Sequence, residues 1–150
     1  MSFSGDIAKF VKHTIDNGDQ IVRRTVFDIG TRLVGRTPVG DAKYWKNPES
    51  TPAGYVGGHA RANWSHSEGA LNTKEFKAID GSEAESNISM RRINKTLKKK
   101  AAGKVHFVQN SVPYIEPLED GHSRQAPNGM VALTRVEFQG IVNAVAGGLR

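Results

Sequence analysis

An apolar pattern at the start of the chain sets the strongest limit on what this sequence can fold into. Between Ile7 and Leu33 the large apolar residues recur mostly at steps of three and four, which predicts one amphipathic helix over residues 1–34. Such a helix is on the order of 45 Å long, more than the diameter expected of a domain of this size. Part of it must therefore either break or project towards a partner. The predicted break or kink is at Asn17-Gly18-Asp19, because Asn and Gly are poor helix formers.

Length and composition predict one globular domain over residues 1–150. The chain has no cysteine, which excludes disulfides, thiolate zinc sites and a cysteine nucleophile. No apolar run reaches the roughly 18 residues of a membrane span. The segment Met1 to Phe10 carries Asp6 and Lys9 where a secretory signal would be uninterrupted and apolar. We therefore expect a cytoplasmic protein without membrane contact.

The order of the remaining elements predicts an α+β fold with a small antiparallel or mixed sheet. Residues 36–59 contain many Pro and Gly residues and are expected to form a long loop. Short strands are predicted over Arg61–Ser65, Val105–Asn110 and Tyr114–Leu118.

Two further helices are predicted from capping boxes. In the first, Ser82 and Glu85 would begin a middle basic helix that runs to about Ala101, with an apolar stripe of Met90, Ile93 and Leu97. In the second, Thr134 and Glu137 would begin a C-terminal helix with an apolar face at Phe138, Ile141, Val142 and Val145.

No catalytic motif and no cofactor site is found in the sequence. The five histidines, His13, His59, His66, His106 and His122, never fall three or four residues apart, so no pair shares a helix face as metal ligands would. There is no G-x-S-x-G elbow and no phosphate-binding glycine loop. The acidic residues Glu116, Glu119 and Asp120 are expected to be solvated. The sequence predicts no enzyme. A hydrolase acting through His59 or His122 is the third-ranked hypothesis, after the two described below.

Positive charge is concentrated in one block of a chain with a net charge of +6. Residues that could contact a polyanion are Arg91, Arg92, Lys95, Lys98, Lys99 and Lys100. The block has no interleaved aromatics for base stacking, and lysines at the end of a helix are favoured by its dipole. It therefore favours nonspecific over specific nucleic-acid contact. A small basic nucleic-acid-binding protein is the alternative from a different functional class.

Two stretches carry a resemblance to a known family. The first is Thr37-Pro38-Val39-Gly40 after the long helix, followed by Gly54 to Trp64 (GYVGGHARANW). The second is Asn110 to Tyr114 (NSVPY), followed by Leu118 to Val131 (LEDGHSRQAPNGMV). In order and separation they resemble the signature of the small neck and tail-completion proteins of tailed bacteriophages, of the lambdoid type. Departures from the family pattern are Gly40, His59 and Asp120.

The resemblance implies a noncatalytic virion structural protein at the head-tail junction. It implies several copies around the DNA channel, in a sixfold or twelvefold ring, in the neck or upper tail of a virion assembled in the host cytoplasm. The implied partners are other copies of the chain, other neck, connector and tail proteins, and packaged DNA through nonspecific contact. A tail terminator or another minor tail protein is the alternative within the same class.

Three segments are predicted contact surfaces: the long N-terminal helix, the loop Lys43 to His59 and the loop Gly121 to Gly129. Exposed loop aromatics suit protein contact, and Pro113 and Pro127 lower the ordering cost of docking. The predicted contact residues are Tyr44, Trp45, Tyr55, Trp64, Tyr114, Glu119, Gly121, Ser123, Gln125, Pro127 and Met130. With equal weight, the aromatics could instead fold back over the core, and the second motif could be a packed turn within the subunit.

Overall fold

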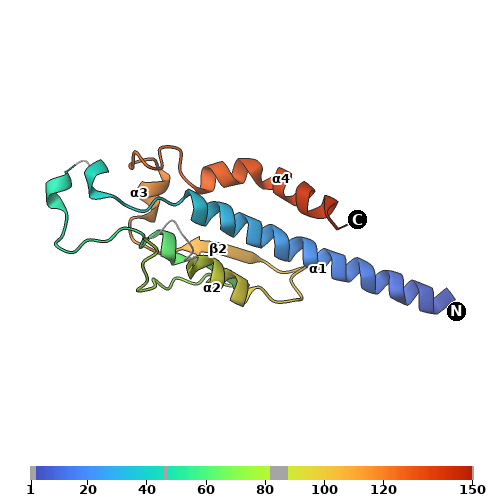
Figure 1. Cartoon of the computed structure of the whole chain (residues 1–150). Helices are drawn as coiled ribbons and strands as arrows, with labels where there is room; N and C mark the ends of the chain where they lie inside the picture. The colour runs from blue at the N-terminus through green and yellow to red at the C-terminus, as the bar shows by residue number, and fades with distance from the viewer. Residues whose placement is uncertain (1–2, 46, 82–87, 150) are drawn as a thin grey trace.

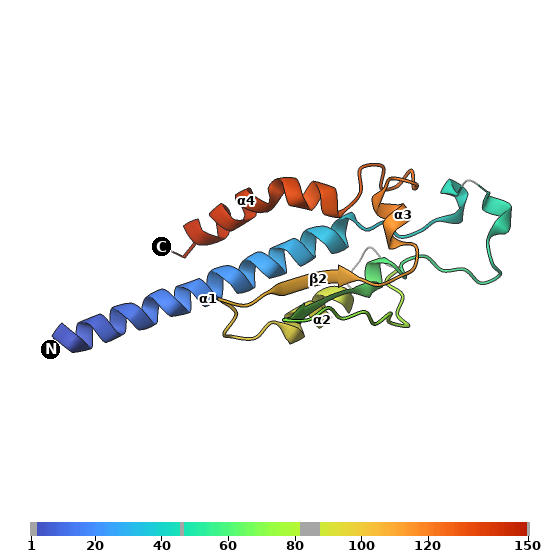
Figure 2. The same cartoon turned by 180° about the vertical axis from the view of Figure 1, so that it is seen from behind.

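The computed structural model describes residues 3–45, 47–81 and 88–149 and confirms a single α+β arrangement. Helix α1 (Phe3–Arg36) lies in the middle, as Figures 1 and 2 show. Helix α4 (Val131–Gly147) packs antiparallel along one side of it. On the other side lie helix α2 (Ile88–Thr96) and a sheet of β1 (Trp64–Glu68) and β2 (His106–Asn110). The remaining elements are short: η1 (Ala42–Tyr44), η2 (Pro48–Ser50), η3 (Arg61–Asn63) and α3 (Ile115–Glu119).

Helix α1 is continuous, so the break predicted at Asn17-Gly18-Asp19 is wrong. The Asp19 carboxylate accepts hydrogen bonds from the amides of Ala101 and Ala102, each at 2.8 Å. This contact ties the middle of α1 to the body and outweighs the low helix propensity of Gly18. The helix instead projects from the body, which is the other arrangement that its length allows. Residues 3–16 are all exposed and extend past the end of α4 as an arm (Figure 1).

The sheet has two antiparallel strands, with Trp64 opposite Asn110 and Glu68 opposite His106. The predicted strand over Val105–Asn110 is confirmed as β2. The strand predicted over Arg61–Ser65 begins only at Trp64, because residues 61–63 form the turn η3. The strand predicted over Tyr114–Leu118 is wrong, since the chain turns there into α3.

The predicted helices exist but their ends differ. Helix α2 ends at Thr96, whose hydroxyl hydrogen-bonds to the carbonyls of Arg92 and Ile93, and not near Ala101. The capping box at Ser82 and Glu85 lies outside the described residues. Helix α4 starts at Val131, before the predicted cap at Thr134, and the Thr134 hydroxyl instead donates to the Met130 carbonyl.

The core lies where α1, α2, the sheet and the start of α4 meet. Its buried members are Val26, Leu33, Val34, Trp64, Met90, Ile93, Leu97, Ala126 and Met130. The predicted stripe of α2 is therefore confirmed. On α4, Ile141 and Val145 are buried as predicted, but Phe138 is exposed. No helix in the described part of the chain is long and apolar enough to cross a membrane.

Candidate interaction surface

The two stretches that carry the resemblance meet at the end of the molecule opposite the arm. Residues from both surround a hollow of about 430 Å³. Figure 1 shows the projecting loop and α3, the elements from which many of them come. Predicted contact residues that line the hollow are Tyr44, Trp45, Tyr55, Tyr114, Ser123 and Gln125. Its other lining residues are Pro38, Gly40, Gly58, His59, Ala60, Leu118 and His122. The structure therefore brings together side chains that are far apart in the sequence.

The loop aromatics fold partly against their own chain. The rings of Trp45 and Tyr55 pack edge to face with centroids 4.8 Å apart. The Tyr55 hydroxyl lies over Gly40, where any larger residue would collide with it. Burial raises the pKa of Tyr55, with a smaller contribution from Asp41. Tyr44 and Tyr55 nevertheless remain 46% and 39% exposed, so the loop covers part of the body and still offers aromatic surface.

Trp64 is a core residue, which corrects its prediction as a contact residue. Only 2% of it is exposed, and its indole N–H donates to the Thr37 hydroxyl at 2.7 Å. The same hydroxyl donates to the Leu33 carbonyl at 2.7 Å. Pro38 disfavours the helical conformation at the residue before it, Thr37. Helix α1 therefore ends at Arg36. Trp64 fixes the direction in which the chain leaves the helix.

Glu119 supplies the cap of α4, although the sequence predicts a solvated or contact residue. Its carboxylate accepts hydrogen bonds from the amides of Met130, Val131 and Ala132 at 2.7 to 2.8 Å. These amides have no partner within the helix, and a carboxylate also suits the positive end of the helix dipole. Met130 itself is fully buried, so it too is corrected from contact residue to core residue.

The loop Gly121 to Gly129 is closed by its glycines. Both have positive φ, as predicted, and a side chain at Gly121 would come within 2.5 Å of the Pro127 carbonyl oxygen. Gln125 then bridges to the other motif, since its side-chain amide donates to the Val39 carbonyl at 3.1 Å. The second motif is therefore in large part a packed turn. Its Ser123 and Gln125 line the hollow, and Pro127 is exposed but is not among the lining residues.

The two histidines of the hollow do not form a catalytic arrangement with a hydroxyl. His59 Nε2 lies 2.7 Å from Glu75 Oε1, and its Nδ1 lies 2.9 Å from the Ala78 carbonyl oxygen. Burial lowers the pKa of His59, but Glu75 and the Ala78 carbonyl together outweigh it and raise the pKa. Within the described residues, neither His59 nor His122 hydrogen-bonds to a serine or threonine. No group of three or more histidine or carboxylate residues there could hold a metal ion.

The basic block is partly used inside the subunit. Arg92 donates to the carbonyls of Ala62 and Trp64 at 2.9 Å and stacks on the Phe76 ring. Its prediction as a polyanion contact is therefore corrected. Lys98 lies 3.5 Å from the Glu68 carboxylate. The remaining predicted polyanion contacts, Arg91, Lys95, Lys99 and Lys100, are exposed.

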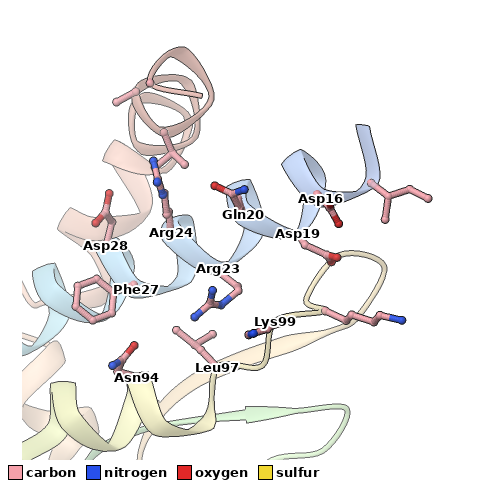
Figure 3. Close-up of a pocket in the computed structure, with 15 residues that line it drawn as sticks. Asp16, Asp19, Gln20, Arg23, Arg24, Phe27, Asp28, Asn94, Leu97 and Lys99 are labelled. Carbon is pink, nitrogen blue, oxygen red and sulfur yellow. The ribbon is translucent and has the colours of Figure 1, made fainter. Parts of the chain in front are cut away.

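A larger groove of about 930 Å³ lies between α1, the end of α4 and the turn after α2. Figure 3 shows Arg23, Leu97 and Lys99 around its opening, with Asp16 and Asp19 at one end. Its lining mixes three aspartates with four basic side chains, so it does not form a surface of one charge for a polyanion.

Several structural residues were missed by sequence reasoning. The Asn63 side-chain amide donates to the carbonyls of His59 and Phe76, and the Asn110 side chain donates to the Ala60 carbonyl at 2.7 Å. Asn63 and Asn110 lie within the stretches of the resemblance, which is the one signal that could have marked them. His66 and His106, from the two strands, hydrogen-bond to each other at 3.0 Å, and no spacing in the sequence indicates that contact.

Comparison with known proteins adds no relative. No family model, no curated protein and no solved structure matches this chain.

Proposed function

We propose that this chain is a noncatalytic structural subunit of a tailed bacteriophage that assembles at the head-tail junction, as a neck or tail-completion ring subunit. The observation that carries the proposal is the arm of α1. All of residues 3–16 are exposed, and they include five large apolar residues: Phe3, Ile7, Phe10, Val11 and Ile15. Contiguous apolar surface of this kind marks a binding site for another protein.

The hollow at the opposite end supports the same role. Its tyrosines Tyr44, Tyr55 and Tyr114 are about half-exposed. The Tyr55 ring already packs against Trp45 within the subunit, so little ordering is needed when a partner docks. A subunit with one contact surface at each end can join two different neighbours, as a head-to-tail ring requires. The resemblance of the segments around the hollow to neck and tail-completion proteins gives the class of those neighbours.

The charge arrangement favours only nonspecific contact with packaged DNA. Arg92 is bound to backbone carbonyls, and Lys98 and Lys104 both contact Glu68. Within the basic block, phosphate contacts are therefore left to Arg91, Lys95, Lys99 and Lys100. These are fewer than the roughly six or more contacts that give a dedicated DNA-binding protein its steep salt dependence. If duplex DNA binds tightly at low salt and is released steeply as salt rises, the nucleic-acid function replaces this proposal.

The test is deletion of the gene from the phage that encodes it, followed by electron microscopy of the particles. We expect filled heads and separate tails, and joined particles when the intact gene is supplied from a plasmid. A version lacking Tyr44 to Tyr55 should fold, as judged by circular dichroism, and fail to join heads to tails. The control is Val136→Ala, which changes an 85% exposed residue of α4 away from both surfaces. Normal particles from the deletion phage would overturn the proposal.

A further inference from the structure

The arm of α1 repeats a face that is buried farther along the same helix. Eighteen residues make about five full turns, so Ile7 lies on the same side as Thr25, and Ile15 on the same side as Leu33. Thr25 and Leu33 are buried in the body. Ile7 and Ile15 are 47% and 58% exposed. The arm therefore offers a packing face that no other part of the described chain covers.

This face also continues the contact between α1 and α4. Arg32 of α1 forms an ion pair with Glu137 of α4 at 2.8 Å, and Thr14 lies one eighteen-residue step before Arg32. Helix α4 ends at Gly147, and the groove beside its last turn is also lined by Ile15. Helix α4 thus ends where the arm of α1 begins (Figure 2), although the apolar residues of α1 go on.

We propose that the arm of a second copy of this chain covers this face in the free protein, running antiparallel to the first. Residues four apart form one of the rows by which helices pack together. On the arm this row is Phe3, Ile7, Val11 and Ile15, and it is symmetric about residue 9. An antiparallel second copy therefore places its Ile15 opposite Phe3 and its Val11 opposite Ile7. Every apolar residue of the row meets another.

The area available fits a stable pair of chains. Phe3 and Phe10 are 81% and 70% exposed, and an aromatic side chain buries roughly 150 Å² or more. With the three aliphatic residues, each arm offers apolar surface on the order of 500 Å². Two arms together bury on the order of 1,000 Å², which reaches the lower limit for a specific interface.

The N-terminal end of the second arm also lies in a favourable electrostatic position. Its Phe3 would lie beside Ile15 and so close to the last turn of α4. The positive start of the second helix then faces the negative end of α4, an arrangement that the helix dipoles favour. The second arm extends the line of α4 along α1.

A pair of this kind is closed, because the same surface is used on both copies. It is therefore a dimer of the free protein, and it must open before the arm can contact a neighbour in a ring. The inference does not rest on the proposed function: the particle experiment can fail while the dimer exists, and the protein can be monomeric while the particles still need it.

The first test is the mass of the full-length protein by light scattering over a range of concentrations. We expect twice the 16.3 kDa of one chain, and the single-chain mass for Phe10→Glu. The matched control is Val136→Glu, a change at an 85% exposed residue of α4, which should leave the dimer intact. A single-chain mass for the unchanged protein at every concentration, or a dimer that Phe10→Glu does not weaken, overturns the proposal.

The second test measures direction and register. Since the chain has no cysteine, Ile7→Cys and Val11→Cys each introduce a single thiol. Mild oxidation of a mixture of the two variants should give a cross-linked dimer joining one of each, in clear excess over either variant oxidised alone. Equal cross-linking of Ile7→Cys with itself would show parallel arms. No cross-link in the mixture would show that the arm packs elsewhere. Either result overturns the proposed pairing.

Discussion

Replacing Glu119 by alanine separates the two interpretations of the second motif. If Glu119 holds the start of α4, the variant destabilises the isolated subunit. If it is a contact residue, the free energy of unfolding of the subunit stays the same and only assembly suffers. The structure favours the first outcome, because one carboxylate accepts hydrogen bonds from three successive amides.

The expected magnitude follows from those bonds. A lost helix cap costs about 0.5 to 2 kcal/mol, and hydrogen bonds to a charged group are at the strong end of the range for hydrogen bonds in proteins. Three bonds to one carboxylate make the loss larger than that of an ordinary cap. Water can reach this partly exposed site and offset part of that loss, so we expect Glu119→Ala to lower the free energy of unfolding by about 2 to 3 kcal/mol. Glu119→Gln keeps an acceptor oxygen but loses the charge, and should lose about 1 kcal/mol.

The assay is urea unfolding of the isolated protein, followed by circular dichroism, with Glu116→Ala as the control. Glu116 lies on the same short helix and is exposed, so its replacement should change the free energy of unfolding by less than about 0.5 kcal/mol. For a chain of this length the expected loss for Glu119→Ala corresponds to a Tm lower by about 4 to 12 °C. A Glu119→Ala protein as stable as the control would refute the capping role and restore the contact interpretation.

Two other predictions concern buried polar groups. Thr37→Val removes the acceptor of the Trp64 indole N–H and should cost about 1 to 3 kcal/mol; urea unfolding checks this, and an unchanged midpoint would contradict it. Burial, and then His106, lower the pKa of His66, against a weaker opposing effect of Glu68. The unfolded chain therefore takes up a proton at a higher pH than the folded one, and stability should fall as the pH drops from about 7 through the ordinary histidine pKa of about 6.5 and below it. A His66→Gln variant should flatten that decline in Tm between pH 7.5 and 5, and an equally steep decline would argue against His66 as its source.

The parts of the fold that follow from local pattern were predictable, and those that depend on distant contacts were not. The amphipathic spacing predicts α1 and the stripe of Met90, Ile93 and Leu97, because burial in a helix repeats every 3.6 residues. The continuity of α1 at Gly18 was not predictable, since it depends on the contact of Asp19 with amides more than eighty residues away. A rule based on neighbouring residues finds only the low helix propensity of Gly18. It does not include the distant contact that offsets it.

The contact residues of the candidate surface were also only partly predictable from the sequence. Chemical type alone made Trp64 and Met130 attractive contact residues, because both are large and apolar. Only closure of the fold shows that they are buried, whereas Tyr44 and Tyr55 stay half-exposed. Capping rules also placed the start of α4 at Thr134, because they search within a few residues. The carboxylate that caps the helix, Glu119, precedes it by more than ten residues and arrives through the turn at Gly121.

The residues of the resemblance thus do two things at once. One group forms hydrogen bonds within the subunit, and those bonds fix the walls of the hollow. Its members are Thr37, Trp64, Asn110 and Glu119. At the other end, the arm of α1 carries large apolar residues that stay about half or more exposed in the single chain. A protein that folded only for its own stability would lose stability from Trp64→Phe and lose nothing from changes on the arm. An assembling subunit should respond to both, the first through unfolding and the second through assembly alone, because only the second set is left for partners.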